Sequence, residues 1–177
     1  HHGLFAVSGI LYNHESPRRP PRFLPRKVTA GAAAIAAGKA DDLVLGDLAA
    51  EQLAAGGLVP FFVPNVMDPP VAPSAARGDA AVLVPWALYQ RYGDKGILAQ
   101  QYTSMRTWVD LVAVAAGPSR LWEEGIQWGD WLDPKAPPDN PGGARTPPAV
   151  VATAYFARSA EVLAQAAEVL GSAEDAA

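Results

Sequence analysis

The apolar residues of this chain follow two different patterns, and the pattern changes near residue 50. Residues 4–12, LFAVSGILY, form a nearly continuous apolar run, which is typical of a strand buried on both faces of a parallel sheet. A loop rich in proline and arginine follows, and Thr29 can then cap an alanine-rich helix that runs to about Gly38. This first segment predicts a strand, a loop and a helix, which is an α/β arrangement.

Beyond Asp47 the pattern predicts helices joined by loops, with a strand considered only at residues 59–63. The first of these helices is expected over residues 79–92. Pro85 lies inside it and should start or kink its regular part, and Gly93 is a suitable C-terminal stop.

Two longer helices are expected after this one. Asp94 can cap a helix that runs to about Ala116, and a last helix is expected from about Pro148 to Leu170. The apolar positions of the first share one face: Leu98, Tyr102, Met105, Val109 and Val112. The apolar stripe of the last helix is expected at Val151, Tyr155, Val162, Ala166 and Val169. Consecutive antiparallel helices of this kind suggest stacked helical hairpins.

Composition narrows the classes of function. Of 177 residues half are apolar, and the net charge of −4 provides no basic surface for nucleic acid or an anionic membrane. No apolar run is long enough to span a bilayer, and the start of the chain lacks the pattern of a secretory signal. The absence of cysteine fits a cytoplasmic location. No metal site is expected, because His1, His2 and His14 have no spaced third ligand.

A long loop at residues 119–147 holds three tryptophans, Trp122, Trp128 and Trp131, among acidic residues, glycines and prolines. Aromatic faces beside carboxylates are typical of sugar sites, but the same rings could instead close the end of a helical bundle. Asp130 and Asp133 likewise allow two interpretations. They could belong to the carboxyl pair of a glycosidase, or they could cap turns and hold the loop.

Residues 47–171 resemble the catalytic region of bacterial α-L-rhamnosidases of glycoside hydrolase family 78. The resemblance rests on the strings DLAAEQ, VPFFVPNV, GDAAVLVPWALYQRYGD, QYTSMRTWVD, IQWGDWLDPKAPPDNP and VATAYFARSAEVLAQAAEVLG, in matching order and spacing. It implies a mainly α fold, part of an (α/α)6 six-hairpin toroid. It also implies inverting hydrolysis of terminal α-L-rhamnosides, no cofactor, and a rhamnose-containing glycan or glycoside as partner.

The resemblance also implies roles for individual residues. Trp131 matches an aromatic residue that lines the rhamnose pocket, and Trp128, Asp130 and Asp133 belong to the same motif. These four residues and Asp79 are the expected substrate-binding residues. Asp79 lies in RGDA where the family usually has WGDA, so an arginine replaces a pocket tryptophan. The family's general acid lies in a DERLGW-like motif that is absent here, and its general base lies beyond the last helix. No catalytic residue is therefore expected in this chain, which should be an inactive fragment.

Residues 3–50 resemble GDP-mannose 4,6-dehydratases, through GLFAVSGILYNHESPRR, RKVTAGAAAIAAG and LVLGDLAAE. This resemblance implies NADP as cofactor, with His14 and Arg19 contacting it. The glycine-rich phosphate loop and the Tyr-x-x-x-Lys pair of that family are absent. The basic residues of the loop could therefore simply be solvated.

The two resemblances meet within residues 46–51, which predicts a chimera of two fragments. The expected division is a dehydratase-like segment at 1–48, a rhamnosidase segment at 49–171 and a tail at 172–177. With so few helices and one strand, exposed apolar faces should favour non-specific self-association. Three functions stay open: a rhamnosidase fragment, a nucleotide-sugar lyase fragment, or a non-catalytic protein that binds rhamnose through Trp128 and Trp131.

Overall fold

Two compact units make up the chain, residues 1–45 and residues 46–177. The computed structural model describes residues 33–39, 47–65, 72–131, 133–140 and 142–172. In the first unit, residues 33–36 are helical and Gly38 has a φ of 63°, in agreement with the predicted end of the alanine-rich helix. The strand predicted at residues 4–12 lies outside the described residues.

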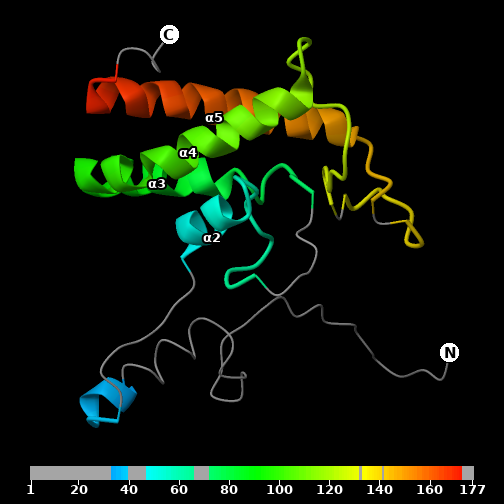
Figure 1. The fold of residues 1–177 in the computed structure, drawn as a ribbon. Coiled ribbons are helices and arrows are strands. Elements are labelled where there is room, and N and C mark those ends of the chain that lie inside the picture. Colours follow the sequence, from blue (N-terminus) through cyan, green and yellow to red (C-terminus); the bar gives the residue numbers. More distant parts are fainter. Residues whose placement is uncertain (1–32, 40–46, 66–71, 132, 141, 173–177) are drawn as a thin grey trace, which may run out of the picture. The chain divides into compact units, whose positions relative to one another are not determined.

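In the described part of the second unit the regular elements are helices, and turns and loops join them. Its helices are α2 (Leu48–Ala54), α3 (Ala80–Tyr92), α4 (Lys95–Ala116) and α5 (Pro148–Leu170). Helix α4 contacts the other three, and α3 and α5 also contact each other (Figure 1). Within the described ranges no residue is in a strand, so the strand considered at residues 59–63 was wrong. None of the helices described is both long and apolar enough to cross a membrane.

The helix ends follow the capping residues of the sequence. Asp94 precedes α4 and its Oδ1 accepts a hydrogen bond from the backbone N–H of Gly96 at 2.8 Å. Gly93 ends α3 in the left-handed conformation, with φ of 70°. Helix α2 was not predicted as a separate element. Its start is nevertheless capped, because the Asp47 side chain accepts from the N–H of Ala50 at 3.1 Å.

The buried face of α4 is the predicted one, with Tyr102 half-buried at its edge. For α5 the predicted stripe was partly wrong, because Val151, Tyr155 and Val169 are only half-buried. The buried positions are Ala152, Phe156, Ser159, Val162, Leu163, Ala166 and Ala167. Helix α5 is rich in alanine and apolar on most sides, so spacing alone does not choose its buried face.

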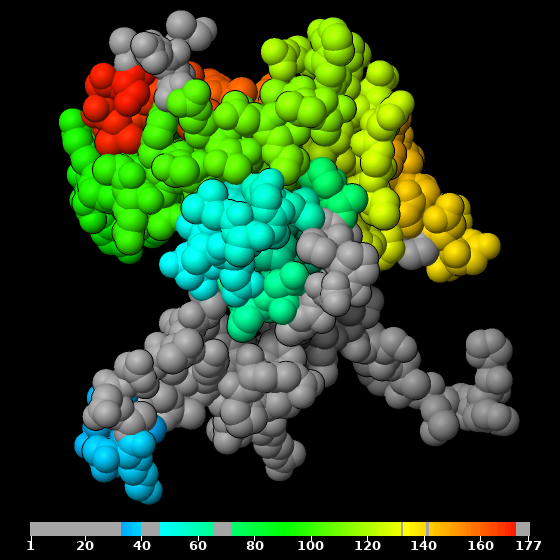
Figure 2. Space-filling view, viewed as in Figure 1, coloured from blue at the N-terminus to red at the C-terminus, as the bar shows by residue number. Residues whose placement is uncertain are grey.

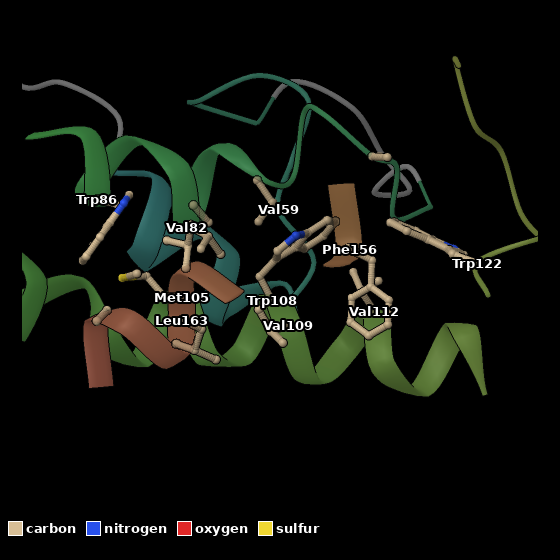
Figure 3. Close-up of a cluster of buried hydrophobic side chains, with 14 of the residues drawn as sticks. Val59, Val82, Trp86, Met105, Trp108, Val109, Val112, Trp122, Phe156 and Leu163 are labelled. Carbon is tan, nitrogen blue, oxygen red and sulfur yellow. The ribbon is translucent and has the colours of Figure 1, made fainter. Parts of the chain in front are cut away.

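The hydrophobic core lies between α3, α4 and α5, with Trp108 of α4 near its middle (Figure 3). Trp86 and Met105 lie toward one end of this cluster, and Trp122 lies at the other. Trp108 and Trp122 meet edge to face, with ring centroids 6.2 Å apart. The core therefore extends from the helices into the beginning of the long loop.

Polar side chains join α2 to α4. The buried Gln52 amide nitrogen donates to the carbonyl oxygens of Gly57 and Ser104, at 3.2 and 3.1 Å. The Ser104 hydroxyl in turn donates to the Gln52 side-chain oxygen. These bonds give the amide oxygen a donor and both amide N–H groups an acceptor, which makes the burial of Gln52 tolerable.

The side chain of Asp79, at the start of α3, connects α3 to α4 and α5. It is fully buried at the start of α3 and accepts hydrogen bonds from Trp108 Nε1 at 3.1 Å and from the Ser159 hydroxyl at 2.6 Å. Its other oxygen accepts from the N–H of Ala76 at 2.8 Å. Gly78 permits this packing, since a Cβ there would lie 2.0 Å from the Trp108 ring. One carboxyl group thus ties α3, α4 and α5 to the segment before α3.

Replacing Asp79 by alanine should destabilise the protein by about 3 kcal/mol, because two buried side-chain donors and one partly buried N–H would lose their acceptor. The free energy of unfolding from urea titration, followed by far-UV circular dichroism, measures this. Asp110→Asn is the control, since Asp110 forms only an exposed ion pair with Arg106 and should change stability by less than about 0.5 kcal/mol. Equal stability of the two variants would contradict the role given to Asp79.

Candidate functional site

The tryptophans of the long loop have different environments. Trp122 is 1% exposed, belongs to the core, and its backbone N–H donates to the Thr153 hydroxyl at 3.0 Å. Trp128 and Trp131 are 36% and 46% exposed. The packing interpretation therefore describes Trp122, whereas the rings of Trp128 and Trp131 remain accessible to a ligand.

A cavity of about 370 Å³ lies against these two exposed tryptophans. Its volume is within the range of roughly 300–1,000 Å³ usual for small-molecule sites. Three separate parts of the chain line it, namely the segment before α3, the long loop and the first turn of α5. The lining residues are Ala75, Ala76, Arg77, Trp128, Gly129, Trp131 and Val151. In the space-filling view the long loop lies at one end of the helical unit, beside the start of α5 (Figure 2).

The two indoles form a corner. Their centroids are 5.0 Å apart and their planes meet at 84°. The turn between them is fixed against α5, because Gly129 has a φ of 59° and an added Cβ would lie 3.0 Å from Pro148 Cα. A ligand in the cavity would therefore meet surfaces of two indoles whose planes are nearly perpendicular.

Of the predicted substrate-binding residues, the structure brings Trp128 and Trp131 together at the cavity. Asp130 is exposed on the turn between them, and its side chain does not line the cavity. Asp79 and Asp133 are buried, at 0% and 5% exposure, and also lie outside the lining. His14 and Arg19, predicted to contact NADP, lie outside the described residues. Within the described part of the chain, no three His, Asp or Glu side chains gather as a metal site would require.

Asp133 holds the second half of the loop. Its oxygens accept from the backbone N–H groups of Lys135 at 2.9 Å and Arg145 at 3.1 Å. The Arg145 guanidinium adds two further bonds, from Nε at 3.0 Å and from Nη2 at 3.4 Å. The side-chain bond from Arg145 and the two backbone bonds lower the pKa of Asp133 from 3.8 to about 2. The turn-holding interpretation thus describes the contacts that Asp133 makes.

The sequence interpretation missed an aromatic cluster around Arg77. The guanidinium carbon of Arg77 lies 4.9 Å from the centroid of Phe61, 5.9 Å from Phe62 and 5.7 Å from Trp128. Phe61 also contacts Trp128, with centroids 6.2 Å apart. The signal was the pair of phenylalanines in VPFFVPN, an apolar doublet enclosed by prolines in a segment too short for a helix.

Comparison with known proteins matches both parts of the chain. The profile of the bacterial alpha-L-rhamnosidase 6 hairpin glycosidase domain matches residues 32–177, and that of GDP-mannose 4,6 dehydratase matches residues 1–53. An alpha-L-rhamnosidase of Formosa agariphila is 36% identical over 119 residues, which is 67% of this chain and 12% of that protein. The chain thus spans about an eighth of the length of this relative.

Solved structures of α-L-rhamnosidases also match this chain. The crystal structure of an α-L-rhamnosidase from Aspergillus terreus matches with a TM-score of 0.69 and 39% identity, over 73% of this chain and 15% of that one. The structure of a Streptomyces avermitilis α-L-rhamnosidase complexed with L-rhamnose matches with a TM-score of 0.53 and 31% identity, over 86% of this chain and 12% of that one. The profile match covers most of the chain, and the mainly helical fold agrees with it. This chain belongs to the bacterial α-L-rhamnosidase six-hairpin glycosidase family, and it carries a GDP-mannose 4,6-dehydratase-like segment at its N-terminal end.

Proposed function

We propose that the cavity at Trp128 and Trp131 binds the terminal α-L-rhamnosyl unit of a glycoside. The observation that carries this proposal is the corner of two exposed indoles in the wall of a cavity of suitable size. A 6-deoxy sugar presents a C–H face and a methyl group, and an indole face and edge offer apolar surface for both. The homologue from Streptomyces avermitilis was crystallised with L-rhamnose, which supports the same ligand here.

A protein with the complete catalytic domain would hydrolyse terminal α-L-rhamnosides with inversion, while this chain by itself would bind them without turnover. Inversion requires two carboxyl groups on opposite sides of the scissile bond. No carboxyl group of the described residues lines the cavity. Asp79 and Asp133 direct their oxygens to internal donors, so neither is placed to protonate a leaving oxygen.

A second candidate function concerns the N-terminal segment. The dehydratase profile matches residues 1–53, and this supports an origin in an NADP-dependent nucleotide-sugar lyase. NADP contacts by His14 and Arg19 stay a prediction. The two profile matches overlap over residues 32–53, and we propose that the segments join within residues 46–51.

Trp131→Ala should weaken binding of methyl α-L-rhamnoside roughly tenfold, because the sugar loses one of its two apolar walls. Isothermal titration calorimetry on the full chain measures the dissociation constants. Ile126→Ala is the matched control, since Ile126 is exposed in the same loop and does not line the cavity. An aryl α-L-rhamnoside in the same preparation should show no turnover above the uncatalysed rate.

Three results would contradict this proposal. Rhamnoside binding that is unchanged in Trp131→Ala would remove the cavity as its site. A folded wild-type chain that binds no rhamnoside would remove the function altogether, and measurable turnover would show that carboxyl groups outside the cavity lining reach the substrate.

Asp133 is proposed as a positioning residue that keeps Trp131 in place. Its pKa is lowered from 3.8 to about 2, so its ionised form stabilises the folded loop above pH 4, and this contribution is lost as the pH falls from about 4 toward 2. Arg145→Met should therefore destabilise the chain at pH 6, and the difference from wild type should shrink toward pH 2. Unfolding free energies measured from pH 2 to 7 test this, with Asp139→Asn as a control in the same loop. A difference that is independent of pH would refute the role of the ion pair.

A further inference from the structure

Arg77 lines the cavity, and a hydrogen bond to the buried Asp79 fixes the backbone just before it. Ala76, the residue before it, has a φ of 65°, which is unusual for a residue with a side chain. The N–H of Ala76 donates to Asp79 at 2.8 Å, and this bond to a fully buried carboxyl group fixes the turn. The start of the Arg77 side chain is thus placed at the cavity by the helical core.

The Arg77 guanidinium lies against aromatic rings and has no carboxyl partner among the residues that the structure describes. It lies within 6 Å of the ring centroids of Phe61, Phe62 and Trp128, the distance at which cation–π attraction acts. Contacts over ring faces leave the N–H groups at the edge of the guanidinium available as donors. Among the described residues, ion pairs join Arg106, Arg145 and Arg158 to carboxylates, and none joins Arg77.

The acidic side chains near the cavity do not neutralise this charge. The carboxyl oxygens of Asp79 accept from Trp108, Ser159 and Ala76. Asp133 is paired with Arg145, and Asp130 is exposed outside the cavity lining. The cavity therefore has one positively charged wall, two indole walls, and no negatively charged lining residue among those described. A neutral sugar would leave the donors of Arg77 without an anionic acceptor.

We propose that Arg77 is a specificity-determining residue and that the cavity selects rhamnosides carrying an anionic group, either a carboxylate on the adjoining sugar or a sulfate ester. A planar guanidinium with free edge donors fits both anions, because each presents two oxygens side by side. This inference rests on the proposed rhamnoside binding and names the class of glycoside that the same cavity takes. Arg77 acts in binding and has no chemical step.

The test compares anionic and neutral ligands on the full chain by isothermal titration calorimetry at low ionic strength. The ligands are a rhamnosyl-uronate disaccharide, its carboxyl-reduced neutral counterpart, and methyl α-L-rhamnoside with and without a sulfate ester. The wild type should bind at least one anionic ligand about tenfold more tightly than its neutral counterpart, the gain expected from a charge-assisted hydrogen bond. The ligand whose affinity exceeds that of its neutral counterpart shows whether the cavity selects a carboxylate or a sulfate.

Variants show whether the preference for anionic ligands comes from Arg77 or from the net charge of the protein. Arg77→Gln should abolish the preference for the anionic ligand over its neutral counterpart, whereas Arg77→Lys should retain part of that preference. Arg91→Gln, an exposed arginine of α3 outside the cavity lining, makes the same change in net charge and should keep the full preference. Far-UV circular dichroism confirms that each variant is folded.

The outcomes keep this inference distinct from rhamnoside binding itself. Equal affinity of the wild type for anionic and neutral rhamnosides, with both lost in Trp131→Ala, would overturn the anionic preference and leave rhamnoside binding intact. A preference that survives in Arg77→Gln would also overturn it. Failure of the folded wild type to bind any of the four ligands would overturn both proposals.

Discussion

The buried carboxyl group of Asp79 is the contact on which the arrangement of α3, α4 and α5 depends. Its two oxygens accept from an indole of α4, a hydroxyl of α5 and a backbone N–H of the segment before α3. A buried acidic side chain is costly unless its oxygens are satisfied, and here three donors from three parts of the chain satisfy them. Because the third donor belongs to Ala76, the same group that orders the helices also sets the position of the cavity wall at Arg77.

The wall at Trp131 depends on a second acidic residue. Asp133 binds two backbone N–H groups and the Arg145 guanidinium, and so closes the loop that carries Trp131. From the family resemblance, Asp79 and Asp133 were both predicted to bind the substrate. In the structure each one bonds to the chain itself, and the side chains that line the cavity are aromatic, aliphatic or cationic. The acidic residues thus support the wall, and the indoles and Arg77 form its surface.

The sequence predicted the helices well where caps and apolar spacing agreed. Gly93 and Asp94 predicted the end of α3 and the start of α4 to within one residue. The spacing of apolar residues by three and four predicted the buried face of α4. The prediction was partly wrong for the buried face of α5. Alanines around this helix reduce the difference between its apolar and polar faces, on which a prediction from spacing depends. The sequence also could not separate the buried Trp122 from the exposed Trp128 and Trp131, because identical side chains differ only through contacts distant in sequence. The cluster of Phe61 and Arg77 was missed for the same reason.

We propose that a rhamnoside binds at the corner of Trp128 and Trp131, while the core tryptophans only support that corner. Titration of the 15N-labelled chain with methyl α-L-rhamnoside, followed through the indole N–H resonances, distinguishes the two groups of tryptophans. The resonances of Trp128 and Trp131 should shift. Those of the buried Trp108, whose N–H donates to Asp79, and of the buried Trp122 should stay unchanged. Shifts confined to Trp108 and Trp122, or an equal small shift of all five indoles, would contradict this proposal.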